Sequence, residues 1–174
     1  TLFPYTTLFR SCQAYRREYG RDFISCMPTN LYGPGDNFDL MSSHVLPALM
    51  VKAHNAKLAG DPVLTVWGSG NPKREFLYVE DAAEACVHLM KTYSDDSHIN
   101  VGSGEDLTIR QLAETVAEAV GFKGALVFDP AKPDGTPRKL MDVARINAAG
   151  WKATTGLKDG IKKTYDWYCK NVAH

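Results

Sequence analysis

The sequence lacks paired cysteines, a surplus of charge of either sign and any long hydrophobic run. It has four cysteines, at Cys12, Cys26, Cys86 and Cys169. They form no Cys-x-x-Cys pair, so neither a zinc ribbon nor a disulfide framework is indicated, and we expect no metal and a reducing, cytoplasmic location. No apolar run is long enough to cross a bilayer, and 20 basic residues balance 20 acidic ones. That balance argues against the broad positive field typical of nucleic-acid binding, so we expect neither nucleic acid nor membrane as a partner.

What is present is an ordinary globular composition, with 44% hydrophobic and 23% charged residues in 174 residues. This length fits one domain or a large piece of one. Short apolar runs predict strands near residues 23–27, 63–67, 75–79 and 125–128. Helical periodicity predicts helices near 12–19, 42–59, 80–93, 108–120, 143–149 and 157–171, with a loop at 30–39. Short strands alternating with longer helices predict an α/β fold with a mainly parallel sheet.

Two helices carry the clearest local signals. Thr108 and Gln111 form a capping-box pattern, and Gly121 follows the last apolar position of the same helix. The helix predicted at 80–93 has apolar residues spaced three and four apart: Ala82, Ala85, Cys86, Leu89, Met90 and Tyr93. This spacing indicates one buried face.

Residues 1–11 (TLFPYTTLFRS) differ from the rest of the chain. They have neither the basic start nor the cleavage site of a signal peptide, and no clear helical or strand period. The string resembles the translation of a sequencing adapter, so we interpret it as a non-native segment and place the genuine sequence at 12–174. The alternative is a native N-terminus that is disordered or strand-like.

Two glycine pairs suggest a dinucleotide-binding turn but do not complete its motif. Gly68 and Gly70 follow a predicted strand, yet Asn71 and Pro72 come next where a helix should begin. In the second pair, at 102–104, the third glycine position holds Leu107. Because the close approach to a pyrophosphate needs the full Gly-x-Gly-x-x-Gly pattern, we interpret both as tight turns.

The most informative strings are MPTNLYGP at 27–34, SHVLPAL at 43–49, VWGSG at 66–70, REFL at 74–77, SHINVG at 97–102 and KPDGTPRK at 132–139. Together they resemble the GDP-L-fucose synthases, a family of extended short-chain dehydrogenases/reductases. The resemblance covers everything from Cys12 onward. The first string also occurs, with small variations, in other sugar-nucleotide epimerases and dehydratases, whereas the second and the last point to this family in particular.

The resemblance implies the C-terminal part of a Rossmann-type parallel sheet together with a smaller α/β substrate-binding domain. It also implies a reaction in which GDP-4-keto-6-deoxy-D-mannose is epimerised at C3 and C5 and its C4 ketone is reduced by NADPH. The C4 ketone acidifies both neighbouring carbons, so one acid/base pair can serve both centres. NADP(H) is the expected cofactor, and the full-length enzyme is expected to be a homodimer.

The resemblance assigns a role to several residues. His44 matches the proton-donating histidine, which suits a side chain whose pKa lies near working pH. Residues 28–31 match the segment beside the nicotinamide, comprising Pro28, Thr29, Asn30 and Leu31; His44 also belongs to the expected cofactor side. The residues matched to the sugar nucleotide are Asn30, Lys52, Trp67, Arg74, Asp134 and Lys139. Trp67 and Arg74 suit this role, because an indole offers a flat apolar surface and a guanidinium makes forked bonds to phosphate.

Each of these residues also has a plainer interpretation when taken alone. His44 is compatible with a helix-start histidine that makes only a local hydrogen bond, and Trp67 with a core residue. Asp134 and Lys139 are also compatible with ordinary loop residues.

In the family, the glycine-rich turn, the Tyr-x-x-x-Lys pair, the assisting serine and the epimerisation cysteine lie upstream of the position of Cys12. Tyr5 is followed four residues later by Phe9 instead of lysine, so it does not supply the pair. We therefore expect this chain by itself to be an inactive C-terminal fragment. Two alternatives stay open: another NAD(P)-dependent sugar-nucleotide epimerase or dehydratase, and a binding module that holds GDP-sugars without chemistry.

Overall fold

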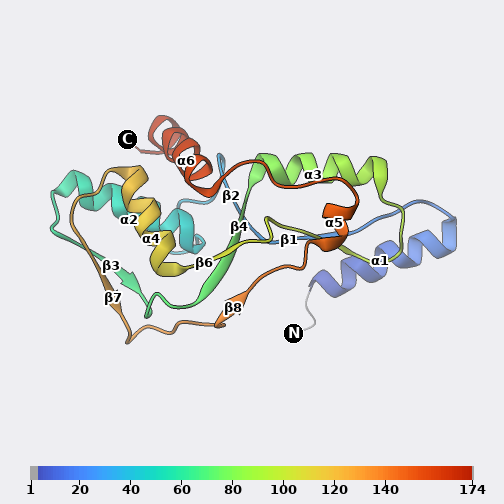
Figure 1. Cartoon of the computed structure of the whole chain (residues 1–174), viewed down its shortest axis with the longest axis horizontal. Coiled ribbons are helices and arrows are strands. Elements are labelled where there is room, and N and C mark those ends of the chain that lie inside the picture. Colours follow the sequence, from blue (N-terminus) through green and yellow to red (C-terminus); the bar gives the residue numbers. More distant parts are fainter. Residues whose placement is uncertain (1–3, 174) are drawn as a thin grey trace.

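The computed structural model describes residues 4–173 as an elongated α/β arrangement (Figure 1). The helices are α1 (Pro4–Tyr19), α2 (Val45–Ala59), α3 (Val79–Thr92), α4 (Ile109–Val120), α5 (Ala144–Ala148) and α6 (Leu157–Asn171). The strands are β1 (Cys26–Pro28), β2 (Asn30–Tyr32), β3 (Val63–Trp67), β4 (Lys73–Tyr78), β5 (Ile99–Val101), β6 (Asp106–Thr108), β7 (Ala125–Asp129) and β8 (Arg138–Lys139). The alternation of strand and helix confirms the predicted α/β class.

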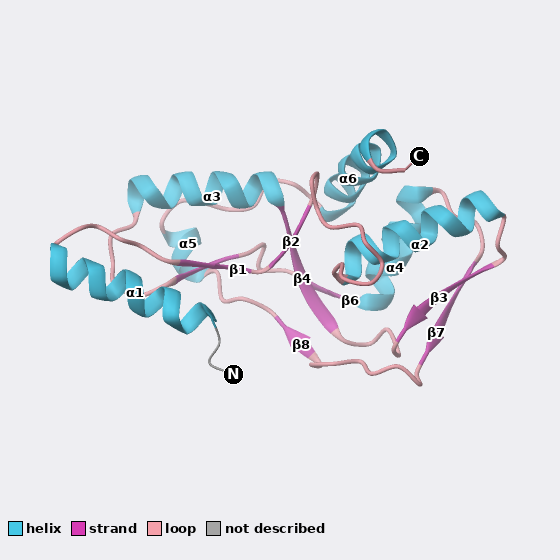
Figure 2. Ribbon diagram, turned by 180° about the vertical axis from the view of Figure 1, so that it is seen from behind, coloured by secondary structure: helices cyan, strands magenta, loops and turns pink. Residues whose placement is uncertain are grey.

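The strands form small sheets that are mainly parallel. β1 pairs with β5, β3 pairs with β7, and β4 pairs with both β2 and β8, all in parallel. The exception is β6, which runs antiparallel to β4. β4 therefore lies in the middle of the molecule and is the common partner of β2, β6 and β8 (Figure 2).

Two separate hydrophobic cores lie on either side of this middle region. The larger core is built on α2, α4 and α6 and includes Met50, Leu112 and Ile161. The smaller core includes Leu89 of α3 and Ile99 of β5, with Trp151 against them. β4 contributes to both, because Phe76 and Tyr78 face the larger core and Leu77, on the opposite side of the strand, faces the smaller one.

Local sequence signals account for several element boundaries. The predicted capping box is present: the Thr108 hydroxyl accepts from the Gln111 amide at 3.1 Å, and the Gln111 side chain accepts from the Thr108 amide at 2.9 Å. Gly60 and Gly121 end α2 and α4 in the left-handed conformation, which glycine adopts without steric cost. Pro47 lies in the first turn of α2, where its missing N–H costs little.

Two strand predictions were wrong in detail. The strand predicted at 23–27 begins only at Cys26, and Phe23 is exposed, because the pairing with β5 starts at Cys26 opposite Ile99. Part of the loop predicted at 30–39 is the strand β2, which pairs with β4. Its partner is distant in sequence, so no local pattern marks it.

Two helix predictions also needed correction. α2 begins at Val45 and not near Ser42, because the Asp39 carboxylate accepts from the amides of Met41 and Ser42 and holds them in a turn. In α3 the buried face is narrower than predicted. Met90 is 77% exposed and Cys86 is also exposed, while Ala82, Ala85 and Leu89 are buried.

The N-terminal segment is helical where the structure describes it. α1 runs without a break from Pro4 to Tyr19, and Gly20 follows with a φ of 60°. The disordered or strand-like N-terminus weighed as the alternative for residues 1–11 is therefore not found from Pro4 onward, while residues 1–3 lie outside the described residues. The non-native origin of the segment stays a prediction. No helix of the described chain is long and apolar enough to span a membrane.

Candidate functional site

Two ammonium groups lie near the indole ring of Trp67. Trp67 ends β3 and is 64% exposed, so it is not the core residue that a lone tryptophan usually is. The Nζ of Lys52, from α2, lies 4.5 Å from the ring centroid, and the Nζ of Lys132 lies 5.3 Å from it. Both distances are within the range of cation–π interactions. The arrangement offers a flat apolar surface beside two positive charges, which suits a planar ring that carries phosphates.

The structure thus brings Lys52 and Trp67 together, and it adds Lys132, which the sequence did not single out. Lys132 follows β7, and β7 pairs with β3 so that Asp129 lies opposite Trp67. This non-local pairing places Lys132 near the ring. The only sequence signal was its position at the start of the KPDGTPRK string.

Asp134 holds the turn that follows Trp67. One carboxylate oxygen accepts from the Ser69 amide at 2.7 Å and the other from the Ser69 hydroxyl at 2.7 Å. The pKa of Asp134 is held below its usual range, mainly by the bond from the Ser69 hydroxyl and also by the bond from the Ser69 amide. Gly68, with a φ of 86°, is needed here because an added Cβ would lie 2.4 Å from the Asp134 carboxylate. Asp134 therefore shapes the turn, and its contact with a ligand stays a prediction.

Arg74 and Lys139 lie opposite one another on the paired strands β4 and β8. The Arg74 guanidinium donates to the carbonyl of Lys73 at 2.7 Å, and Lys139 is exposed. Figures 1 and 2 show the ends of β3 and β7, the start of β4 and the strand β8 along one edge of the molecule. The residues expected to contact the sugar nucleotide, apart from Asn30, therefore lie on or beside elements of this edge, which is rich in cationic side chains.

The segment expected beside the nicotinamide lies where β1 ends. Pro28 is the last residue of β1, and the Thr29 amide donates to the Val101 carbonyl at 3.0 Å. The Asn30 side chain donates to the carbonyl of Glu75 at 2.7 Å, which leaves its own carbonyl oxygen to accept from a ligand. Leu31 is partly exposed in β2. Ligands of α/β sheets characteristically bind at the carboxyl ends of parallel strands, which is where this segment lies.

His44 precedes the first residue of α2. Its backbone is extended, with φ −72° and ψ 170°, and its side chain makes no capping hydrogen bond. The ring is exposed, so the interpretation of a histidine used only as a local cap is not supported. The pKa of the nearby Asp36 carboxyl is raised, because the effect of burial outweighs the lowering effects of a hydrogen bond from the Asn37 amide and of the neighbouring His44. Among the described residues, the Oδ2 atom of Asp36 has no hydrogen-bond partner.

Glu75 is a second residue that the sequence did not single out. Its side chain is fully buried in β4, and its carboxylate accepts from the amides of Gly104 at 2.7 Å and Met141 at 2.8 Å. Its carbonyl accepts from Asn30 and, at 3.3 Å, from the Thr29 hydroxyl. Two features of the sequence hinted at it: Glu75 lies within the REFL string at 74–77, and its carboxylate immediately precedes the apolar run at 76–79.

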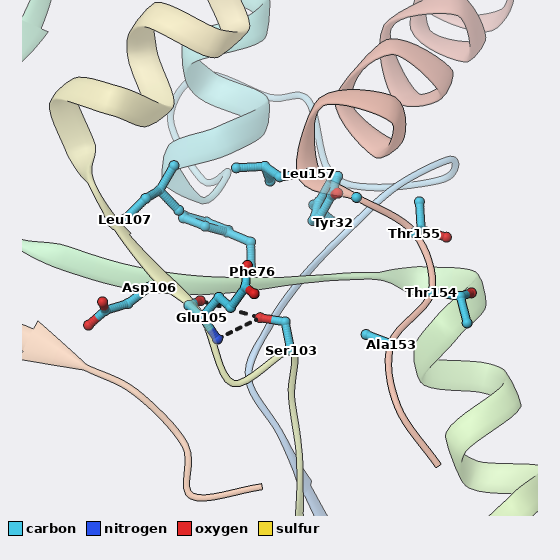
Figure 3. Close-up of a pocket in the computed structure, with 11 residues that line it drawn as sticks. Tyr32, Phe76, Ser103, Glu105, Asp106, Leu107, Ala153, Thr154, Thr155 and Leu157 are labelled. Carbon is cyan, nitrogen blue, oxygen red and sulfur yellow. Dashed lines mark hydrogen bonds between the residues drawn. The ribbon is translucent and has the colours of Figure 1, made fainter. Parts of the chain in front are cut away.

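A cavity of about 320 Å³ lies beside Ser103, whose hydroxyl donates to the Glu75 carboxylate at 3.4 Å. Figure 3 shows the rings of Tyr32 and Phe76 between the segments 103–107 and 153–157 that line it. The second segment is fixed by buried Asp81, which accepts from the amides of Thr154 and Thr155. None of the predicted site residues lines this cavity, so we do not assign the site to it.

Comparison with known proteins decides the family. A model described as the NAD dependent epimerase/dehydratase family matches residues 6–102, more than half of the chain. The chain belongs to this family. Among curated relatives, GDP-L-fucose synthase 1 of Arabidopsis thaliana is 56% identical over 165 residues, which cover 95% of this chain and 51% of that protein. GDP-L-fucose synthase of Escherichia coli (strain K12) is 52% identical over 169 residues, which cover 92% and 53%.

Solved structures of epimerase/dehydratase relatives agree with the fold. The NADP-bound GDP-L-fucose synthetase of Naegleria fowleri superposes with a TM-score of 0.86 at 35% identity, over 95% of this chain and 53% of that one. The chain therefore spans about half the length of the relatives that it matches. The Rossmann-type α/β class expected from the sequence is confirmed.

Proposed function

We propose that this chain is the sugar-nucleotide-binding half of a GDP-L-fucose synthase. The observation that carries the proposal is the exposed Trp67 ring with the Nζ atoms of Lys52 and Lys132 at 4.5 and 5.3 Å from its centroid. Trp67 ends β3, on the same edge of the molecule as the start of β4, the strand that carries Arg74. A guanine ring and a diphosphate need such a combination of aromatic surface and cations. Identities of 52% to 57% to proteins named GDP-L-fucose synthase favour this activity over that of another sugar-nucleotide epimerase or dehydratase.

In the complete enzyme, the substrate would be GDP-4-keto-6-deoxy-D-mannose. His44, exposed at the start of α2, would donate the proton to the carbon that is inverted, first at one neighbour of the C4 ketone and then at the other. Arg74 and Lys52 would hold the diphosphate while Trp67 contacts the base.

NADP(H) fits the segment at the end of β1. The main chain of 28–31 and the Asn30 side-chain carbonyl oxygen provide polar groups, and Leu31 provides apolar surface, for one side of a nicotinamide. The cofactor would supply the hydride for reduction at C4. The chain's own contribution is to orient the sugar, because Asn30 lies on β2 next to the strand that carries Arg74. We also propose that the complete protein is a cytoplasmic homodimer.

The test uses a chimera in which this chain replaces the matching half of the E. coli relative. We expect the chimera to oxidise NADPH when the keto-sugar is present and to bind GDP more tightly than UDP in calorimetric titrations. Binding of GDP without any turnover would favour the non-catalytic binding module. Absence of both binding and turnover from a folded chimera would contradict the proposal.

A further inference from the structure

Glu75 is a buried carboxylate with main-chain partners instead of a cation. Its side chain is 0% exposed, and its two oxygens accept separately from Gly104 and Met141, with the Ser103 hydroxyl a further donor at 3.4 Å. The ion pairs found among the described residues do not include Glu75. Because burying a charge without partners is costly, these hydrogen bonds must be kept for the region to fold as it does.

The surrounding chain is built to fit this carboxylate. A Cβ added to Gly102 would lie 2.3 Å from the Oε1 atom of Glu75, so only glycine leaves room for it. Each oxygen is bound to a different segment, one after β5 and one after β8. The side chain is therefore a cross-link between two connections that are far apart in the sequence.

The main chain of Glu75 makes a third connection. Its carbonyl accepts from the side chains of Asn30 and Thr29, the residues proposed to lie beside the nicotinamide. Arg74, the preceding residue, is proposed to hold the diphosphate, and Lys139 lies opposite Arg74 on β8. One residue thus joins the cofactor side of the proposed site to its sugar-nucleotide side.

We infer that Glu75 is a positioning residue that fixes the distance between the nicotinamide-side strand and the strands that hold the sugar nucleotide. The inference rests on the proposed function. Reduction at C4 needs the cofactor and the sugar in a fixed relation, whereas proton exchange at C3 and C5 needs only the sugar and its acid and base. Loss of the cross-link should therefore slow reduction more than exchange.

Glu75→Gln tests this in the chimera. Glutamine has nearly the same shape, but its NH2 group cannot accept, so either the Gly104 or the Met141 amide loses its partner. We expect the rate of C4 reduction to fall about 10- to 100-fold, as for misplacement of reacting groups by about 1 Å, while solvent deuterium exchange at C3 and C5 changes less than about threefold.

Asp81→Asn is the matched control. Asp81 is also buried, at 3% exposed, and also accepts from two main-chain amides, but the segment that it fixes, at 154–155, carries none of the residues proposed to contact the cofactor or the sugar nucleotide. We expect it to lower the melting temperature as Glu75→Gln does, and to leave the ratio of reduction to exchange unchanged.

Should Glu75→Gln fail to fold, Gly102→Ala displaces the same carboxylate from the opposite side and is expected to shift the same ratio. An unchanged ratio in whichever variant folds, or failure of both to fold while Asp81→Asn does, would overturn the positioning role and leave Glu75 as a purely structural group. A wild-type chimera without reduction or exchange would instead contradict the proposed function itself, so the two failures are distinguishable.

Discussion

The ammonium group of Lys52 lies 4.5 Å from the centroid of the Trp67 ring, although one residue belongs to α2 and the other to β3. With Lys132 at 5.3 Å, the indole has two ammonium groups near its ring and still remains largely exposed. This exposed aromatic surface is the main structural argument for a nucleotide site.

Trp67→Ala should weaken binding of GDP to the chimera. Stacking of a base on an aromatic side chain is worth about 1–3 kcal/mol, so we expect the dissociation constant to rise about 5- to 150-fold. Calorimetric titration with GDP measures this change. Trp67→Phe is the control, because it keeps an aromatic face and should retain most of the affinity. An alanine variant that binds GDP as tightly as the wild type would remove Trp67 from the site.

Arg74→Ala should weaken binding of the GDP-sugar more than binding of NADPH. A hydrogen bond to a charged group contributes about 1.5–3 kcal/mol, so we expect a loss of roughly 10- to 100-fold for the sugar nucleotide. Separate titrations with the two ligands check the difference. Arg74→Lys keeps the charge but loses the forked hydrogen-bonding geometry, so its affinity for the GDP-sugar should lie between those of the wild type and of Arg74→Ala. Equal losses for both ligands would argue against a contact with the sugar nucleotide's phosphates.

His44→Asn should abolish epimerisation while leaving the keto-sugar able to bind, because the acid is removed and the pocket is not. Since the His44 side chain makes no capping hydrogen bond, the substitution should cost little stability. Solvent deuterium exchange at C3 and C5, measured together with the melting temperature, is the appropriate assay. Wild-type exchange in the variant would show that another group donates the proton.

The chain by itself should show no NADPH oxidation and should self-associate. Within the described residues β1 pairs only with β5, so one edge of β1 carries main-chain groups without a strand partner. Such an edge invites pairing with another chain. We expect broad elution in size-exclusion chromatography and weak amide protection in β1, with stronger protection in α4. A monodisperse and active monomer would contradict this expectation.

Local patterns in the sequence predicted the helices better than the strands. The capping box at Thr108 and the glycine after α4 act within one helix, so the sequence displays them directly. β2 was missed because Asn30 pairs with Phe76, a partner that no nearby residue indicates.

The same limit applies to the candidate site. Trp67 and Lys52 were identified by resemblance, and the structure shows that they meet. Lys132 depends on the pairing of β3 with β7, and the role of Glu75 depends on three separate segments that meet at one buried carboxylate. Neither arrangement can be read from spacing along the chain, because each is set by tertiary packing.

Identification of the product formed by the chimera tests the central claim most directly. The purified chimera would be given GDP-4-keto-6-deoxy-D-mannose and NADPH, and the nucleotide sugar would be analysed by NMR, with His44→Asn in parallel. We expect GDP-L-fucose, inverted at C3 and C5 and reduced at C4, from the wild-type chimera and none from the variant. A product reduced at C4 without inversion, or no product from a folded wild-type chimera, would contradict the proposed activity.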